Sequence, residues 1–141
     1  MTSFGWWCRA QGRSDTGAAA VEFALLLPIL LLVLFGIIDF GRAYNMQIAL
    51  TQASREGVRG LALGTTADPT NVVQSSSFPV TGVSVAYTTC PSSPTSASNA
   101  TVTASKQFTY ITPISGVLSI LGLGSLAAPV ISGKAQMRCG G

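Results

Sequence analysis

Gly17-Ala-Ala-Ala-Val-Glu22-Phe-Ala-Leu-Leu-Leu-Pro28 opens the longest apolar run of this chain of 141 residues, and the run continues to Ile38. Residues 18–38 are 21 consecutive positions with a single charged side chain, Glu22. A helix of this length rises about 31 Å, which matches the roughly 30 Å of hydrocarbon in a bilayer. The run therefore predicts a transmembrane helix over residues 18–38.

The helical pattern continues past the apolar run to about residue 63. Gly60 and Gly64, followed by Asp68-Pro69, signal the end of the helix. A helix over 18–63 rises about 69 Å, so its second half is expected to leave the membrane as a stalk, and Pro28 is expected to kink it. Small and apolar residues recur along the stalk at spacings of three and four, as in an amphipathic helix. They are Ala43, Met46, Leu50, Ala53, Gly57 and Leu61.

Charged residues are scarce, at 9% of the chain, which is typical of a membrane-anchored protein rather than a soluble domain. We therefore expect membrane lipid as a partner. The eight cations form no dense stripe, so we expect no nucleic acid as a partner. Two opposite-charge pairs stand at a spacing of three along the stalk and are expected to pair on its surface. They are Asp39 with Arg42 and Glu56 with Arg59.

The periodicity changes after residues 64–79, a polar stretch that we interpret as a linker. Apolar and polar residues then alternate over residues 83–88, 101–110 and 130–139, which predicts three strands. A sheet this small is marginal alone, so its apolar face is expected to pack on the long helix. The predicted fold class is α+β, with the long helix followed by a small antiparallel β domain over residues 80–141.

A second apolar stretch, residues 114–126, lies in the uncharged interval between Lys106 and Lys134. Its prolines, glycines and hydroxyl residues would break a lipid-facing helix. We expect a short apolar helix that packs on the sheet or lies at the membrane surface. A second transmembrane span is the alternative.

Three cysteines are present. Cys8 precedes the apolar run, whereas Cys90 and Cys139 belong to the distal part, where an oxidising compartment would join them in a disulfide. Two separate thiols are the alternative. The chain has no His and no CxxC motif, so no metal site and no cofactor are expected. The five scattered carboxylates suggest no catalytic site, and we expect that the protein is not an enzyme.

The position of Glu22, five residues after Gly17, resembles the processing site of type IV pilin-like precursors. The resemblance implies a leader over residues 1–17, cleavage between Gly17 and Ala18 by a prepilin peptidase, and an acidic residue at mature position five. A secretory signal would instead have a small-residue site after its apolar core, and none follows here. A signal anchor that is not cleaved is the alternative.

Three segments carry a closer resemblance to a family, the TadE-like proteins, which are minor pseudopilins of tight-adherence (Flp) pilus systems. They are Gly17–Pro28, Phe35–Tyr44 and Ala53–Arg59, and the closing stretch Gly133–Arg138 is similar in style. The resemblance covers about residues 13–63. Flp-type sites often carry Glu-Tyr where this chain has Glu22-Phe23, an aromatic replacement that leaves the site plausible.

The TadE-like resemblance implies insertion in the cytoplasmic membrane and partners among other pilin-like subunits and the pilus assembly machinery. We expect a single pass with the N-terminus in the cytoplasm and the C-terminal domain outside, and possible incorporation in a surface pilus. A membrane-anchored extracytoplasmic binding module unrelated to pili is the alternative function. After cleavage, Glu22 would lie one helical turn from the new amine of Ala18 and could pair with that of a neighbouring subunit. The alternative is a carboxylate at headgroup level with no partner.

Overall fold

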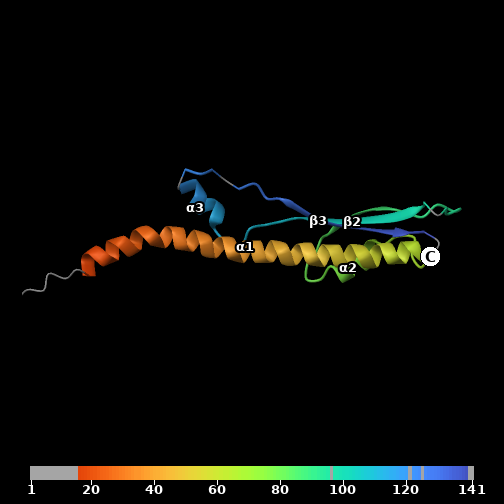
Figure 1. The fold of residues 1–141 in the computed structure, drawn as a ribbon, viewed down its shortest axis with the longest axis horizontal. Coiled ribbons are helices and arrows are strands. Elements are labelled where there is room, and N and C mark those ends of the chain that lie inside the picture. Colours follow the sequence, from red (N-terminus) through yellow and green to blue (C-terminus); the bar gives the residue numbers. More distant parts are fainter. Residues whose placement is uncertain (1–15, 96, 121, 125, 140–141) are drawn as a thin grey trace, which may run out of the picture.

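The computed structural model describes residues 16–95, 97–120, 122–124 and 126–139 and shows an α+β fold, as the sequence predicts. A long helix runs the length of the molecule, and a small sheet and two short helices lie along it (Figure 1). In chain order the elements are α1 (Thr16–Ala62), α2 (Thr70–Ser76), β1 (Ser84–Thr88), β2 (Asn99–Gln107), α3 (Ile114–Ile120) and β3 (Val130–Arg138).

Helix α1 contains 47 residues and ends close to where the glycine signals predict. Gly64 adopts a φ of 67°, the left-handed conformation that a residue with a Cβ disfavours. The amide of Thr65 donates to the carbonyl of Gly60 at 3.0 Å, and that of Gly64 donates to Leu61 at 3.2 Å. This pair of hydrogen bonds is the Schellman arrangement, which satisfies carbonyls at a helix end and stops the helix.

No other part of the described chain packs against the N-terminal part of α1, residues 17–30. Residues 17–30 are all exposed, although most of them are apolar. Figure 1 shows this red-to-orange part bending away from the axis of the remaining helix. Pro28 lies inside α1 and removes one helical hydrogen bond, a common cause of such bends.

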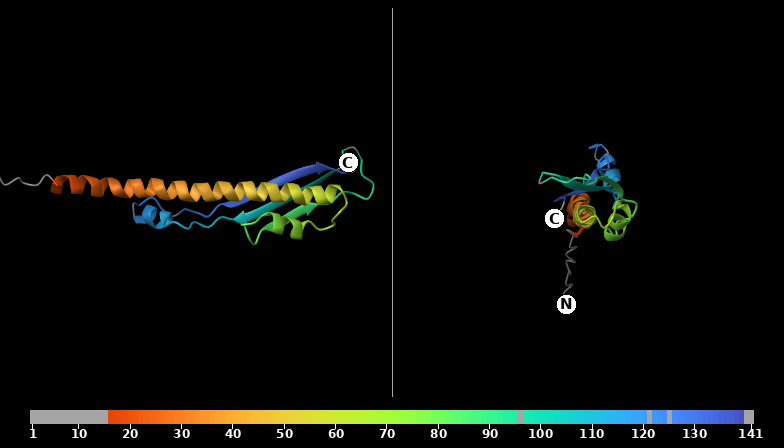
Figure 2. Two further views of the ribbon diagram at one scale, coloured as in Figure 1. Left: turned by 90° about the horizontal axis from the view of Figure 1, so that it is seen from below. Right: turned by 90° about the vertical axis from the view of Figure 1, so that its right-hand side faces the viewer.

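The sheet is antiparallel with strand order β1-β2-β3, so the central strand, β2, pairs on both sides. Val102 of β2 stands opposite Tyr87 of β1 and Ala135 of β3. Both views in Figure 2 show the sheet covering the yellow, C-terminal half of α1. Alternate β2 residues, Ala100, Val102 and Ala104, are fully buried. The predicted cover of the sheet by the long helix is therefore present.

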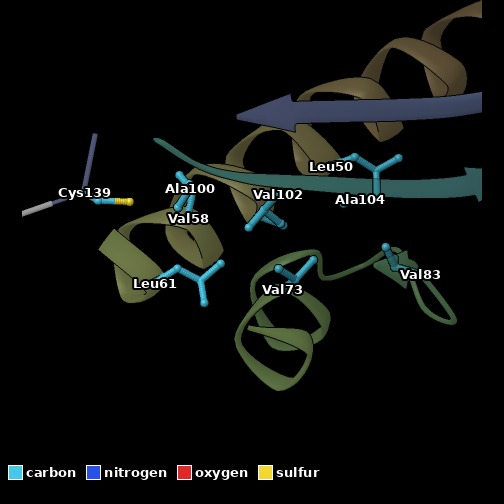
Figure 3. Close-up of a cluster of buried hydrophobic side chains, with 10 residues drawn as sticks. Leu50, Val58, Leu61, Val73, Val83, Ala100, Val102, Ala104 and Cys139 are labelled. Carbon is cyan, nitrogen blue, oxygen red and sulfur yellow. The ribbon is translucent and has the colours of Figure 1, made fainter. Parts of the chain in front are cut away.

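The core lies between α1, the sheet and α2 (Figure 3). The predicted stripe on α1 contributes its distal members to this core, while Ala43 and Met46 are half-buried. Val58 is buried as well, because α1 is covered by the sheet on one side and by α2 on another. The buried apolar residues of the cluster are Leu50, Ala53, Val58, Leu61, Val73, Val83, Ala100, Val102, Ala104 and Cys139.

Helix α1 and strand β3 approach each other at backbone distance. A Cβ placed on Gly133 would lie 2.5 Å from the carbonyl carbon of Leu50, so no larger residue fits there. The hydroxyl of Ser54, fully buried, lies 2.8 Å from the carbonyl oxygens of both Leu50 and Gly133 and accepts from the Ala104 amide at 3.3 Å. These contacts fix the register of the sheet on α1.

The segment over residues 64–79 is not a simple linker, because it contains α2. Val73 of α2 is fully buried and lies against Gly57 of α1, where an added Cβ would come within 2.6 Å of the Val73 side chain. Val73 and the missing Cβ of Gly57 on α1 are the reason that this polar stretch folds back. Its serines and threonines are typical of a linker, although the segment contains a short helix with one buried apolar residue.

Candidate processing and assembly site

The predicted processing residues lie in the first two turns of α1. Gly17, Ala18, Glu22 and Phe23 are all helical and exposed, with 61% of the Phe23 side chain accessible. Glu22 follows Ala18 by four positions, so the two lie on the same side of the helix. Most of the predicted leader, residues 1–15, and with it Cys8, lies outside the described residues. Cleavage itself stays a prediction.

Gly17 has no packing role within the described chain. A Cβ added to Gly17 would meet nothing within 4 Å, and the same holds for Gly36 and Gly41 of α1. Gly57 and Gly133, in contrast, are required by close contacts to Val73 and to the α1 backbone. The contacts of the fold therefore explain the distal glycines, whereas they do not explain the one at position 17.

Glu22 stands in an otherwise apolar surface. Its neighbours Val21, Leu25 and Leu26 are each more than half exposed. Within the described residues the ion pair found is Asp39–Arg42, and Glu22 takes no part in it. A carboxylate in a spanning segment is costly without a partner, so its place here favours an interaction with a group from outside the described chain.

An exposed apolar stripe continues from the predicted span onto the stalk. Ile37, Phe40, Tyr44 and Ile48 recur at spacings of three and four and are 65%, 74%, 61% and 42% exposed. The sequence shows this spacing, but only the fold shows that these side chains stay exposed. We call these four residues the outer stripe. Their exposure offers a surface on which a second helix can pack.

Asp39 and Arg42 form the predicted pair, with 3.6 Å between Asp39 Oδ1 and Arg42 Nη1, but Asp39 is not on the surface. It is 4% exposed, because the chain after β2 covers it. The amide of Ile111 donates to Oδ1 at 3.4 Å, and the hydroxyl of Thr112 donates to Oδ2. Asp39 therefore fastens this segment to α1 at the distal end of the predicted span. A carboxylate directly after an apolar run is the signal for such a role.

Arg42 strengthens the same attachment. Its Nη1 donates to the carbonyl of Thr109 at 3.2 Å, and its guanidinium lies 5.5 Å from the centre of the Phe108 ring. The other predicted pair, Glu56 with Arg59, forms no ion pair in the described structure.

Cys90 and Cys139 are joined by a disulfide. It ties the segment after β1 to the end of β3, and Cys139 is buried at the edge of the core. The bond closes a loop with a sequence separation of 49 residues. The disulfide predicted from the sequence is therefore present.

Helix α1 is long and apolar enough to cross a membrane, so by length and composition it is a candidate transmembrane helix, as the sequence predicts. No curated protein and no solved structure matches the chain. A family model, described as TadE-like protein, matches residues 17–59. The match begins at Gly17 and includes both the exposed half of α1 and the half that packs under the sheet. It suggests a protein associated with Tad pili. Helix α1 therefore carries a TadE-like segment, which confirms the family resemblance predicted from the sequence.

Proposed function

We propose that the chain is a membrane-anchored minor pseudopilin that a prepilin peptidase cleaves between Gly17 and Ala18. In this proposal it is not an enzyme but a subunit in the assembly of tight-adherence pili, and so serves surface attachment. Its single pass has the N-terminus in the cytoplasm and the sheet domain outside. The Cys90–Cys139 disulfide supports this orientation, because such bonds persist in oxidising compartments.

The observation that carries the proposal is the unused surface of α1. Residues 17–30 present apolar side chains on all sides, with one carboxylate among them, and all of these residues are exposed. A simple anchor needs the apolar side chains but has no need of Gly17 and Glu22. Both lie inside the TadE-like match, and their spacing resembles that of type IV pilin-like precursors.

Glu22 gives the proposal a physical mechanism. A carboxylate at the bilayer centre costs around 3 kcal/mol on insertion scales, and less toward the interface, where Glu22 lies. The amine created at Ala18 is cationic near neutral pH. Pairing of Glu22 with the Ala18 amine of an adjacent subunit would offset the cost and set the axial register between the two helices. The outer stripe would extend the same helix–helix contact beyond the membrane.

The test is the N-terminal residue of the membrane form, measured by mass spectrometry in the native host. We expect Ala18 in the unaltered protein and an uncleaved chain in Gly17→Leu. Gly41→Leu is the matched control, since both glycines are helical and a Cβ added at either one would meet no atom within 4 Å. Cleavage should be normal in Gly41→Leu.

An intact leader in cells that contain the peptidase would contradict the proposal and favour the anchored binding module. Equal cleavage of Gly17→Leu and of the unaltered chain would also contradict it. A processed chain that never crosslinks to a pilin-like subunit would leave the maturation step standing and remove the role in assembly.

A further inference from the structure

Helix α3 lies beside the part of α1 that is predicted to be within the membrane. Figure 1 shows α3 next to the orange part of α1 and well away from the sheet, and the left view of Figure 2 agrees. The two helices are in contact. Leu31, Leu32, Phe35 and Gly36 are half-buried, whereas all of residues 17–30 are exposed. One side of α1 is therefore covered at the level of residues 31–36.

Residues 31–36 lie inside the predicted membrane span. If the span ends at Ile38, residues 31–36 lie roughly 3–10 Å below its distal edge. Interfacial helices are buried about 5–10 Å into the boundary between headgroups and acyl chains. The position of α3 along α1 corresponds to that depth.

Large apolar side chains are exposed around α3. Ile111, Ile120, Leu123 and Leu126 are 65%, 86%, 70% and 43% exposed in the isolated chain. No charged residue occurs between Lys106 and Lys134 in the sequence. We call residues 111–120, 122–124 and 126 the α3 loop. Such a surface is unfavourable in water and favourable against lipid.

Several polar groups of the α3 loop are satisfied within the chain, as lipid requires. Helix α3 ends in the same Schellman arrangement as α1, with Gly122 at a φ of 73° and the amide of Leu123 donating to Leu118 at 2.9 Å. The Ser119 hydroxyl donates to the carbonyl of Gly116 at 2.8 Å. The Thr112 hydroxyl donates to Asp39.

Cations lie where headgroups would meet this loop. Arg42 is four positions past Ile38, about 6 Å beyond the hydrocarbon edge. Arg42 and Lys106 line one cavity of about 450 Å³, together with Asn45 and Thr81. Cations at this level suit the phosphate groups of lipids. The apolar α3 loop lies at the predicted level of the acyl chains, and the cations lie at the predicted level of the headgroups. This order matches the layers of a bilayer surface.

We propose that the α3 loop is a second membrane contact, embedded in the leaflet nearest the sheet, with lipid covering Ile120 and Leu123. Asp39 and Arg42 hold the loop against α1 at the correct depth. The sheet domain then has two attachments to the bilayer surface, α1 and the loop, which restricts its tilt. The proposal rests on the membrane anchoring of α1 but not on cleavage at Gly17 or on pilus assembly.

The test uses spin labels on the full chain in vesicles of phosphatidylethanolamine and phosphatidylglycerol. Single cysteines replace Ile120 and Leu123 in a Cys8→Ser background that keeps the Cys90–Cys139 disulfide. Collision with oxygen, which partitions into lipid, is compared with collision with a water-soluble nickel chelate. Leu30→Cys, on the span, is the lipid control, and Leu63→Cys, 56% exposed at the end of α1 far from the span, is the water control.

We expect the oxygen-to-nickel ratio at positions 120 and 123 to exceed that at position 63 by several-fold and to approach that at position 30. A ratio at both positions equal to that at position 63 would overturn the proposal. Exclusion of both reagents would also overturn it, since a protein surface would then cover the loop. A water-exposed label at position 30 would reject the anchoring of α1 and the loop contact together, without bearing on cleavage.

Discussion

The two halves of α1 belong to one continuous helix but obey different constraints. Residues 17–30 are exposed and apolar, whereas most of the apolar residues between Leu50 and Leu61 are buried under the sheet and α2. A Cβ added at Gly41 would meet no atom within 4 Å, whereas one added at Gly133 would clash with the backbone of Leu50. The distal half is thus explained by the fold. In our proposal, the proximal half is explained by what surrounds the protein, namely lipid, a peptidase and other subunits.

The largest effect should come from reducing the disulfide, which belongs entirely to the distal region. Opening a loop of about 50 residues removes up to about 4 kcal/mol of stability in the chain-entropy model. Hydrogen exchange of the β2 amides in micelles should speed up on reduction, while the amides of residues 18–38 should not change. Cys8→Ser is the control and should behave as the unaltered protein. Equal acceleration of exchange at the β2 amides and at the amides of residues 18–38 would contradict the division.

Gly133→Ala should have the next largest effect. Its Cβ would lie against backbone atoms that cannot rotate away, and overpacking of this kind costs about 1–3 kcal/mol, occasionally more. The free energy of opening at β2, measured by hydrogen exchange, should fall accordingly. Gly41→Ala is the matched variant in open space, and there the better helix propensity of Ala should stabilise by up to about 1 kcal/mol. Effects of the same sign and size would show that the close approach of α1 and β3 is wrong.

A smaller effect is expected from pH at the far end of the stalk. The hydroxyl of Thr70 at 2.6 Å, and then its amide at 2.9 Å, donate to Asp68 and hold the pKa of that carboxyl below its ordinary value of 3.8. A lowered pKa means that the unfolded chain binds the proton more readily. The stability that Asp68 contributes is therefore present above about pH 4 and is lost as the pH falls further.

Asp68→Asn tests this pH dependence. The difference in stability between this variant and the unaltered chain should be small at pH 7 and should shrink as the pH falls below 4, measured by thermal unfolding in micelles. A difference that grows with acid would contradict the assigned direction.

Much of the fold could be predicted because its signals are local. The helix end at Gly64, the strand alternation around Val102 and the α1 stripe through Leu50 and Ala53 all follow from spacing along the chain. Helix α2 could not be predicted, because its reason is a long-range fit between Val73 and Gly57. The burial of Asp39 depends likewise on Thr112, which is 73 residues away in the sequence.

The processing residues could be named from the sequence alone, yet the contacts within the structure do not account for them. Gly17 and Glu22 stand exposed on α1, with no described neighbour that requires either. The sequence pattern that predicts them is the spacing between the two residues and the start of the apolar run. Residues that act toward a partner leave a pattern in the sequence and few contacts in the fold of one chain.

The smallest effect on folding is expected from Glu22→Gln, which should matter only for assembly. The neutral amide is cheaper to bury than a carboxylate, so membrane insertion should be preserved and the exchange of β2 should not change. Crosslinking to other pilin-like subunits should fall, because the charge match with the Ala18 amine is lost. Glu22→Asp should be intermediate, since it keeps the charge on a shorter side chain. Glu56→Gln, an exposed glutamate on the distal half of the same helix, is the matched control and should crosslink normally. Normal crosslinking and piliation in Glu22→Gln would reduce Glu22 to a processing signal or a headgroup-level carboxylate.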